Sequence, residues 1–80
     1  MDVKVEKRDG KLEDYDAGKI IKVVVTAGLG QEEAEKLAEG ITKWLSQWGQ
    51  HKVTSLQIRD RVILEMQKID KDVSRAYISY

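Results

Sequence analysis

Three cationic side chains near the N-terminus have the types and spacing to bind an anion. Lys7 and Arg8 precede the turn signal Asp9-Gly10, and Lys19 falls in the first turn of a predicted helix. Lysine and arginine pair readily with phosphate and carboxylate groups. Because the positive end of the helix dipole disfavours a cation, Lys19 in that turn indicates a bound anion. These residues therefore predict a local anion site.

A predicted β-hairpin, residues 2–8 and 11–14, positions Lys7. Its turn is Asp9-Gly10, because both central residues of a type I′ turn need positive φ, which glycine adopts freely and aspartate tolerates. With that two-residue loop, Lys7 faces Leu12 and Val5 faces Asp14. Directly opposed side chains project from the same face, so Lys7 is expected to point inward among apolar residues. An ammonium group there is costly unless a partner or a bound anion satisfies it.

The start of the first helix positions Lys19. Asp16 is the predicted N-cap, and the helix is expected to run from about Ala17 to Ala27. Unpaired backbone N–H groups at a helix start bind phosphate readily, and Gly18 lets a ligand approach the backbone closely. The hairpin and the helix are therefore expected to bring Lys7 and Lys19 to one anion.

The rest of the chain predicts three more helices. Apolar residues recur at helical spacing from Gln31 to about Trp48, a capping box at Thr54–Gln57 opens a third helix, and Asp70 caps a fourth. The run Val23–Val25 leaves a buried strand open as the alternative to the first helix. The predicted fold is α+β, with a small N-terminal β-hairpin capping a four-helix bundle in the order β-β-α-α-(β)-α-α. A very short third strand at Val53-Thr54 would make the hairpin a three-stranded sheet.

Length and composition limit the function classes. Residues 1–80 are expected to form a single domain, either alone or as the N-terminal part of a longer chain. The counts of basic and acidic residues are both 14, which argues against a generic nucleic-acid or membrane-surface module. The chain has no cysteine, and no metal site held by the protein is predicted. No apolar run approaches a membrane span, so a cytoplasmic setting is the expectation.

The sequence resembles a known family at both of its ends. A valine-rich strand, Lys7-Arg8-Asp9-Gly10, the acidic pair at positions 13 and 14, and Asp16-Ala17-Gly18-Lys19-Ile20 look like the opening of an ATP-cone domain. Ser74-Arg75-Ala76-Tyr77-Ile78 resembles the Arg-Ala-Tyr segment of that family's last helix. The resemblance implies a small adenine-nucleotide-binding regulatory domain of the kind found in ribonucleotide reductases and their transcriptional repressor. There, ATP and dATP bias activity or oligomeric state.

The resemblance also implies a phosphate subsite. Lys7, Arg8 and Lys19 would neutralise the triphosphate of ATP or dATP, with Mg²⁺ bridging phosphate oxygens. Without the resemblance, ion pairs with neighbouring acidic residues explain these cations as well.

A base subsite is implied by the same resemblance. Val5 would offer its backbone and side chain to the adenine, while Glu13 and Asp16 would accept hydrogen bonds from its exocyclic amine. Ser55 and Arg59 align with positions that border the nucleotide. A solvated helix face is the competing interpretation of Arg59.

No catalytic constellation is apparent. The chain has no Walker-type glycine-rich loop and no nucleophile paired with a base, so it is expected to be a regulatory domain and not an enzyme. Its expected partners are an attached or separate catalytic domain, or a second copy of the chain as a homo-oligomer.

Two other functions are the alternatives. A nucleotide-independent protein–protein interaction module would use Trp44, Trp48 and the C-terminal tyrosines as its docking surface. A helix-turn-helix-like nucleic-acid module would need a basic recognition face, which acidic residues in the last two helices dilute. Binding of nucleic acid or of a membrane is therefore not expected for this domain.

Overall fold

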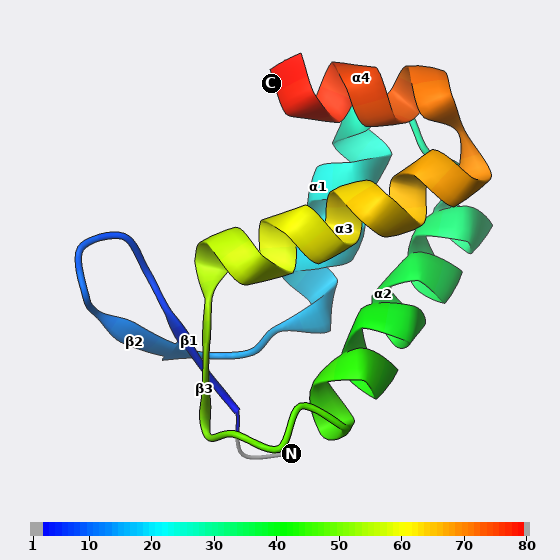
Figure 1. Cartoon of the computed structure of the whole chain (residues 1–80). Coiled ribbons are helices and arrows are strands. Elements are labelled where there is room, and N and C mark those ends of the chain that lie inside the picture. Colours follow the sequence, from blue (N-terminus) through cyan, green and yellow to red (C-terminus); the bar gives the residue numbers. More distant parts are fainter. Residues whose placement is uncertain (1–2, 80) are drawn as a thin grey trace.

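Seven short elements make up residues 3–79, which are the part of the chain that the computed structural model describes (Figure 1). They are β1 (Lys4–Glu6), β2 (Leu12–Asp14), α1 (Ala17–Ala27), α2 (Gln31–Ser46), β3 (Lys52–Thr54), α3 (Ser55–Ile69) and α4 (Lys71–Ser79). The α+β class and the predicted element order, including the short third strand, are confirmed.

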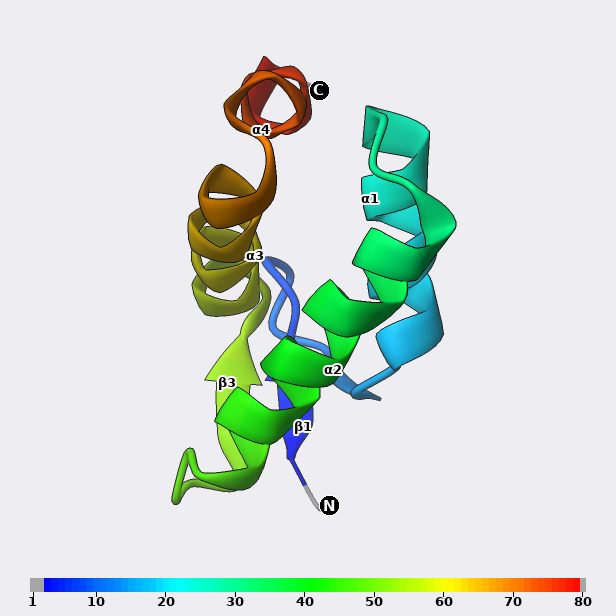
Figure 2. The same ribbon diagram turned by 90° about the vertical axis from the view of Figure 1, so that its right-hand side faces the viewer.

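The three strands form one sheet in the order β2-β1-β3. β1 is antiparallel to β2 and parallel to β3, with Val5 opposite Val53. Both valines are buried, so the middle of the sheet joins the core. β3 leads directly into α3, and the hairpin lies beside the N-terminal ends of α1 and α3 (Figures 1 and 2).

The hairpin loop differs from the predicted turn. The Lys7 N–H donates to the Lys11 carbonyl at 2.9 Å, and the Gly10 N–H donates to the Lys7 carbonyl at 2.9 Å, so the loop has three residues, 8–10. Gly10 alone of these has positive φ, at 86°. The Asp9 carboxylate accepts from the Lys11 N–H at 3.0 Å, which fixes the turn locally. A three-residue loop needs positive φ only at its last position, and this relieves Asp9 of that strain.

This loop moves the side chains of β2, Leu12, Glu13 and Asp14, to the opposite faces from those predicted. Glu13 pairs with Val5 and therefore lies on the inner face, while Leu12 pairs with Glu6 and is 55% exposed on the outer face. Lys7 follows Val5 by two residues and so points to the same face of the sheet, but its side chain is 52% exposed. The predicted register was wrong, and Lys7 does not carry the burial penalty expected of it.

α1 has its predicted bounds, and the alternative of a buried strand is wrong. The Asp16 carboxylate accepts from the Gly18 N–H at 2.9 Å, which confirms the N-cap. Gly28 ends the helix with φ 122°, and its N–H reaches the carbonyls of Val24 and Val25. Val24 is fully buried, so packing overrides the weak helix propensity of the β-branched run.

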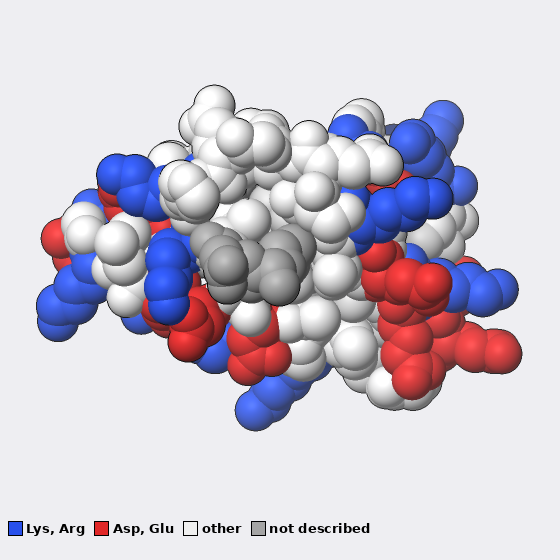
Figure 3. All heavy atoms as spheres, turned by 90° about the horizontal axis from the view of Figure 1, so that it is seen from below, with Lys and Arg blue, Asp and Glu red and all other residues white. Residues whose placement is uncertain are grey.

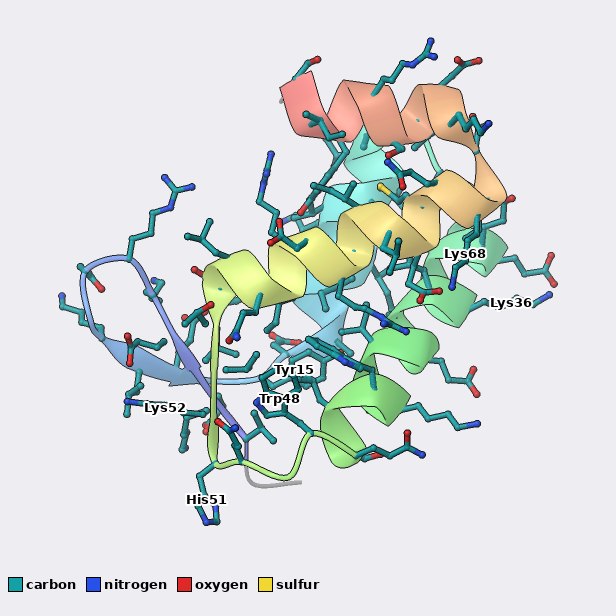
Figure 4. The ribbon with its side chains drawn as sticks, viewed as in Figure 1. Tyr15, Lys36, Trp48, His51, Lys52 and Lys68 are labelled. Carbon is teal, nitrogen blue, oxygen red and sulfur yellow. The ribbon has the colours of Figure 1, made fainter. Side chains whose placement is uncertain are left out.

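The core lies between the sheet and the helices. Its largest fully buried side chains are Ile41, Leu45, Met66, Val24, Val53 and Ser74. Trp44 and Trp48 pack against this core with ring centroids 5.0 Å apart, and the Trp48 indole donates to the Lys52 carbonyl at 2.9 Å (Figure 4). α2 ends at Ser46, slightly before the predicted end.

The last two helices begin at their predicted caps. Thr54 and Gln57 form the capping box of α3, with bonds of 3.0 and 2.9 Å. Asp70 accepts from the backbone of Asp72 and Val73 at the start of α4. Tyr80, one of the C-terminal tyrosines of the alternative docking surface, lies outside the described residues. Among residues 3–79, none of the helices is both long and apolar enough to span a bilayer.

Candidate functional site

Two adjoining hollows form a groove along the hairpin, α1 and α3. Both are lined by Lys19, Ile20, Ser55 and Ile58. The hairpin pocket adds Val5, Glu13, Asp14, Tyr15 and Asp16. The helical pocket adds Val23, Val24, Arg59, Val62 and Tyr77. Each measures about 150 Å³, which is below the roughly 300–1,000 Å³ of usual ligand sites, so a nucleotide would need both.

Lys7 and Lys19 converge at the open side of the hairpin pocket. Glu13 Oε2 lies 3.6 Å from Lys7 Nζ and 3.4 Å from Lys19 Nζ. Lys7 follows β1, Lys19 lies in the first turn of α1, and Glu13 lies on β2, so three elements meet at this carboxylate. Ion pairs as exposed as these contribute under about 1 kcal/mol to stability. The cluster therefore leaves both ammonium groups accessible to a stronger anion.

The start of α1 is occupied by its own cap. Asp16 Oδ1 accepts the Gly18 N–H, and a Cβ added at Gly18 would lie 3.1 Å from that same oxygen. The sequence predicts that the N–H groups at this helix start are free for an anion. The Gly18 N–H is not free, because it is bonded to Asp16. Glycine at this position keeps the cap uncrowded, and Asp16 still lines the hairpin pocket.

An apolar floor underlies the polar rim of the groove. Val5 is buried, and Ile20 and Ile58 are partly buried against the core. Glu13 and Asp16 stand at the same pocket, so an apolar surface lies next to hydrogen-bond acceptors. This combination suits a flat aromatic ring that carries an amino group.

Ser55 and Arg59 extend the groove along α3. Ser55 opens the helix and lines both pockets, whereas Arg59 lines only the helical pocket. The Arg59 guanidinium lies 5.6 Å from the ring centroid of Tyr77, and its Nη2 donates to the Ile78 carbonyl at 3.4 Å. Arg59 is thus partly buried and joins α3 to α4, which the solvated-face interpretation did not anticipate.

The environment of Tyr77 reflects this contact. Burial raises the pKa of the Tyr77 phenol above its ordinary value, and the positive charge of Arg59 opposes that rise. Burial also raises the pKa of Tyr15, whose hydroxyl group forms a 2.9 Å hydrogen bond with the hydroxyl group of Thr42 on α2. Both phenols are neutral near pH 7 and give the groove polar but uncharged walls.

Arg8 is a predicted site residue that does not line the groove. It sits exposed in the hairpin loop and lines neither pocket. With other residues in the described range 3–79 it forms no ion pair. Lys7 also lines neither pocket but reaches the groove through Glu13. The other six predicted residues line the groove.

Eight pocket-lining residues were missed as site residues: Asp14, Tyr15, Ile20, Val23, Val24, Ile58, Val62 and Tyr77. Helical spacing assigns the two isoleucines to the apolar side of their helices, and periodicity does not separate a pocket wall from the core. Tyr15 directly follows the acidic pair of β2, which was the available signal for it.

Charges around the hairpin are mixed. Seen from the sheet end of the molecule, basic and acidic side chains lie next to one another over the hairpin (Figure 3). On the outer face of the sheet, Lys4 pairs with Asp14, and Lys52 pairs with Glu6 at 3.1 Å. The inner face differs, because Lys7 there shares one carboxylate with Lys19 of α1.

Two comparisons with known proteins gave matches to this chain. Residues 3–80 match the ATP cone domain family. An uncharacterized protein of Archaeoglobus fulgidus is 39% identical over 41 residues, which are 51% of this chain and 87% of that protein. The family match covers essentially the whole chain, from the hairpin to the last helix. The chain therefore belongs to the ATP-cone family of nucleotide-binding regulatory domains.

Proposed function

We propose that this domain binds ATP or dATP in the groove and thereby controls a catalytic domain of the ribonucleotide reductase type. The observation that carries the proposal is the convergence of Lys7 and Lys19, from separate elements, at the mouth of a pocket with an apolar floor. A nucleotide has the same two parts, a polyanion and an apolar ring.

The adenine ring would lie in the hairpin pocket. Val5, Ile20 and Ile58 provide its apolar contacts, and Glu13 and Asp16 accept from its exocyclic amine. Asp16 uses Oδ1 for the helix cap, which leaves its second oxygen for the base. The ribose would then extend past Ser55 and Arg59 into the helical pocket.

The triphosphate would bind to Lys7 and Lys19, with Arg8 turning in from the loop. Exposure of all three side chains supports this, because none has to break a buried contact. Mg²⁺ would arrive with the nucleotide and bridge its phosphate oxygens.

Regulation would follow from the elements that the groove connects. Its walls come from the hairpin, α1, α3 and α4, so a bound nucleotide favours the arrangement in which all four contact it. The surface of that arrangement would then bias an attached or separate catalytic domain, or a second copy of the chain. Residues 1–80 would act as one such unit, either alone or as the N-terminal part of a longer chain.

The interaction-module alternative is less well supported. Its docking surface was to include Trp44 and Trp48, but both pack against the core, and Trp44 is also covered by Arg61, 5.5 Å from its ring centroid.

A titration monitored by amide chemical shifts tests the proposal. ATP, dATP, ADP, GTP and a short DNA duplex are added separately to the isotope-labelled chain. Saturable shifts at Val5, Lys7 and Lys19 with adenine nucleotides alone are expected. Silence with ATP at millimolar concentration contradicts the proposal.

A matched pair of double variants locates the site. Lys7→Ala with Lys19→Ala should fold and lose the response to ATP. Lys36→Ala with Lys43→Ala removes the same charge from the exposed side of α2, where Lys36 points away from the hairpin (Figure 4), and should keep the response. Normal affinity in the first variant would place the site elsewhere.

A further inference from the structure

Glu13 contacts both lysines that are proposed to bind the phosphates. Its Oε2 atom lies between the ammonium groups of Lys7 and Lys19, at 3.6 and 3.4 Å, and the same residue lines the hairpin pocket. A single side chain therefore connects the phosphate subsite with the base subsite of the proposed function.

We propose that Glu13 is an internal counter-ion that changes partners when a nucleotide binds, so that selectivity for the base depends on the phosphates. The inference rests on the proposed nucleotide function. A triphosphate carries more charge than one carboxylate and forms charge-assisted hydrogen bonds to the same two ammonium groups. It would therefore displace Glu13 from the lysines.

The displaced carboxylate would turn toward the hairpin pocket. The backbone of Glu13 is held in β2 opposite Val5, on the inner face of the sheet, so its side chain stays at the hairpin pocket. There it is a pure acceptor without a partner, and an unpaired acceptor in a partly desolvated site is costly. An amino group on the base would satisfy it.

Purine discrimination follows from this exchange. Adenine offers an exocyclic amine, whereas guanine presents a carbonyl oxygen at the corresponding ring position, which would face the carboxylate with like partial charge. While Glu13 remains paired with the lysines, it is already satisfied and discriminates little. A monophosphate should leave the ion pairs of Glu13 intact, so the preference for adenine over guanine should be weak among monophosphates. It should be strong among triphosphates.

Affinities of one ligand series test the inference. AMP, GMP, ATP, GTP and inorganic tripolyphosphate are titrated calorimetrically into the wild-type chain, Glu13→Gln and Glu6→Gln. Glu6→Gln is the matched control, because it removes the same charge from the outer face, where Glu6 pairs with Lys52. Amide spectra establish that each variant is folded.

The wild-type preference for ATP over GTP should exceed its preference for AMP over GMP by about tenfold, as expected for one hydrogen bond to a charged group. Glu13→Gln should bind tripolyphosphate several-fold tighter than Glu6→Gln does, because no carboxylate must be displaced from the lysines. Its preference for ATP over GTP should fall to the value for the monophosphates.

The outcomes separate this inference from the proposed function. If the wild-type chain binds ATP but its base preference is the same for mono- and triphosphates, the exchange is wrong and the nucleotide function stands. Equal tripolyphosphate affinity of Glu13→Gln and Glu6→Gln would likewise contradict the exchange alone. If the wild-type chain binds neither ATP nor tripolyphosphate, both proposals are wrong.

Discussion

Lys7 and Lys19 meet at one oxygen atom, Glu13 Oε2, although one residue follows a strand and the other opens a helix. Two like charges brought together in this way repel each other, and the shared carboxylate offsets that repulsion but leaves the cluster with a net positive charge. A fold that places them together without a strong gain in stability is better explained by a ligand. The site should therefore respond to mutation mainly through binding.

Lys19→Ala should weaken ATP binding at least about tenfold, because one charge-assisted hydrogen bond to phosphate is lost. Its free energy of unfolding should change by less than about 1 kcal/mol, since the ion pair with Glu13 is exposed. Calorimetric titration and urea denaturation measure the two effects. Lys22→Ala, also exposed on α1, is the control and should leave both nearly unchanged. A loss of stability without a loss of affinity would contradict a binding role.

Helix limits and caps were predictable from the sequence, but the hairpin register was not. Asp16, Thr54 and Asp70 cap their helices as predicted, because each cap depends on residues only two or three positions away. The signal Asp9-Gly10 fits both a two-residue loop and a three-residue loop that ends in glycine. Which loop forms depends on which face of the hairpin must be buried. The pairing of β3 with the edge of β1 opposite β2 contributes to that requirement.

The candidate site was predictable in part, for a related reason. The sequence predicted convergence of Lys7 and Lys19, but it placed Lys7 in an apolar environment and did not single out Glu13 as the partner that they share. A one-residue change of register transfers Glu13 from the outer face to the inner face. Contacts across the groove, such as Arg59 with Tyr77, join residues distant in the chain, and helical periodicity carries no signal for them.

Arg59→Ala should raise the pKa of Tyr77 further above its ordinary value. Burial already raises this pKa, and the guanidinium over the ring opposes the rise, so its removal leaves burial unopposed. Nuclear magnetic resonance titration of labelled tyrosine measures the shift. Arg75→Ala is the control, because Arg75 is exposed and pairs with Asp72 at 3.9 Å. An unchanged Tyr77 pKa in Arg59→Ala would contradict an electrostatic effect of Arg59, on α3, on Tyr77, on α4.

Stability should decline in alkali partly through Tyr77. The pKa of Tyr77 is raised in the folded chain above the value of 10.0 that applies when the residue is unfolded. Above that pH the unfolded chain loses the phenolic proton first, so stability present below it is lost as pH rises through the folded pKa. Urea denaturation at successive pH values should show a shallower decline for Tyr77→Phe than for the wild-type chain. Identical slopes would contradict the burial of this phenol.

Gly40→Ala and Gly18→Ala should change the free energy of unfolding by different amounts or in opposite directions, although both place alanine in a helix. Nothing lies within 4 Å of a Cβ added at Gly40, which occupies an exposed position in α2. The alanine there gains helix propensity without a clash and should raise the free energy of unfolding by about 0.5–1 kcal/mol. A Cβ at Gly18 would lie 3.1 Å from Asp16 Oδ1, which caps α1, so displacement of the cap offsets the same gain.

Urea denaturation compares the stabilities of the two glycine variants, and calorimetric titration with ATP compares their affinities. Gly18→Ala should also weaken ATP binding, because Asp16 lines the hairpin pocket, while Gly40→Ala should bind normally. Equal stabilisation by the two substitutions would mean that the cap tolerates the added methyl group. In that case the glycine at position 18 would have no structural role in keeping Asp16 at the pocket.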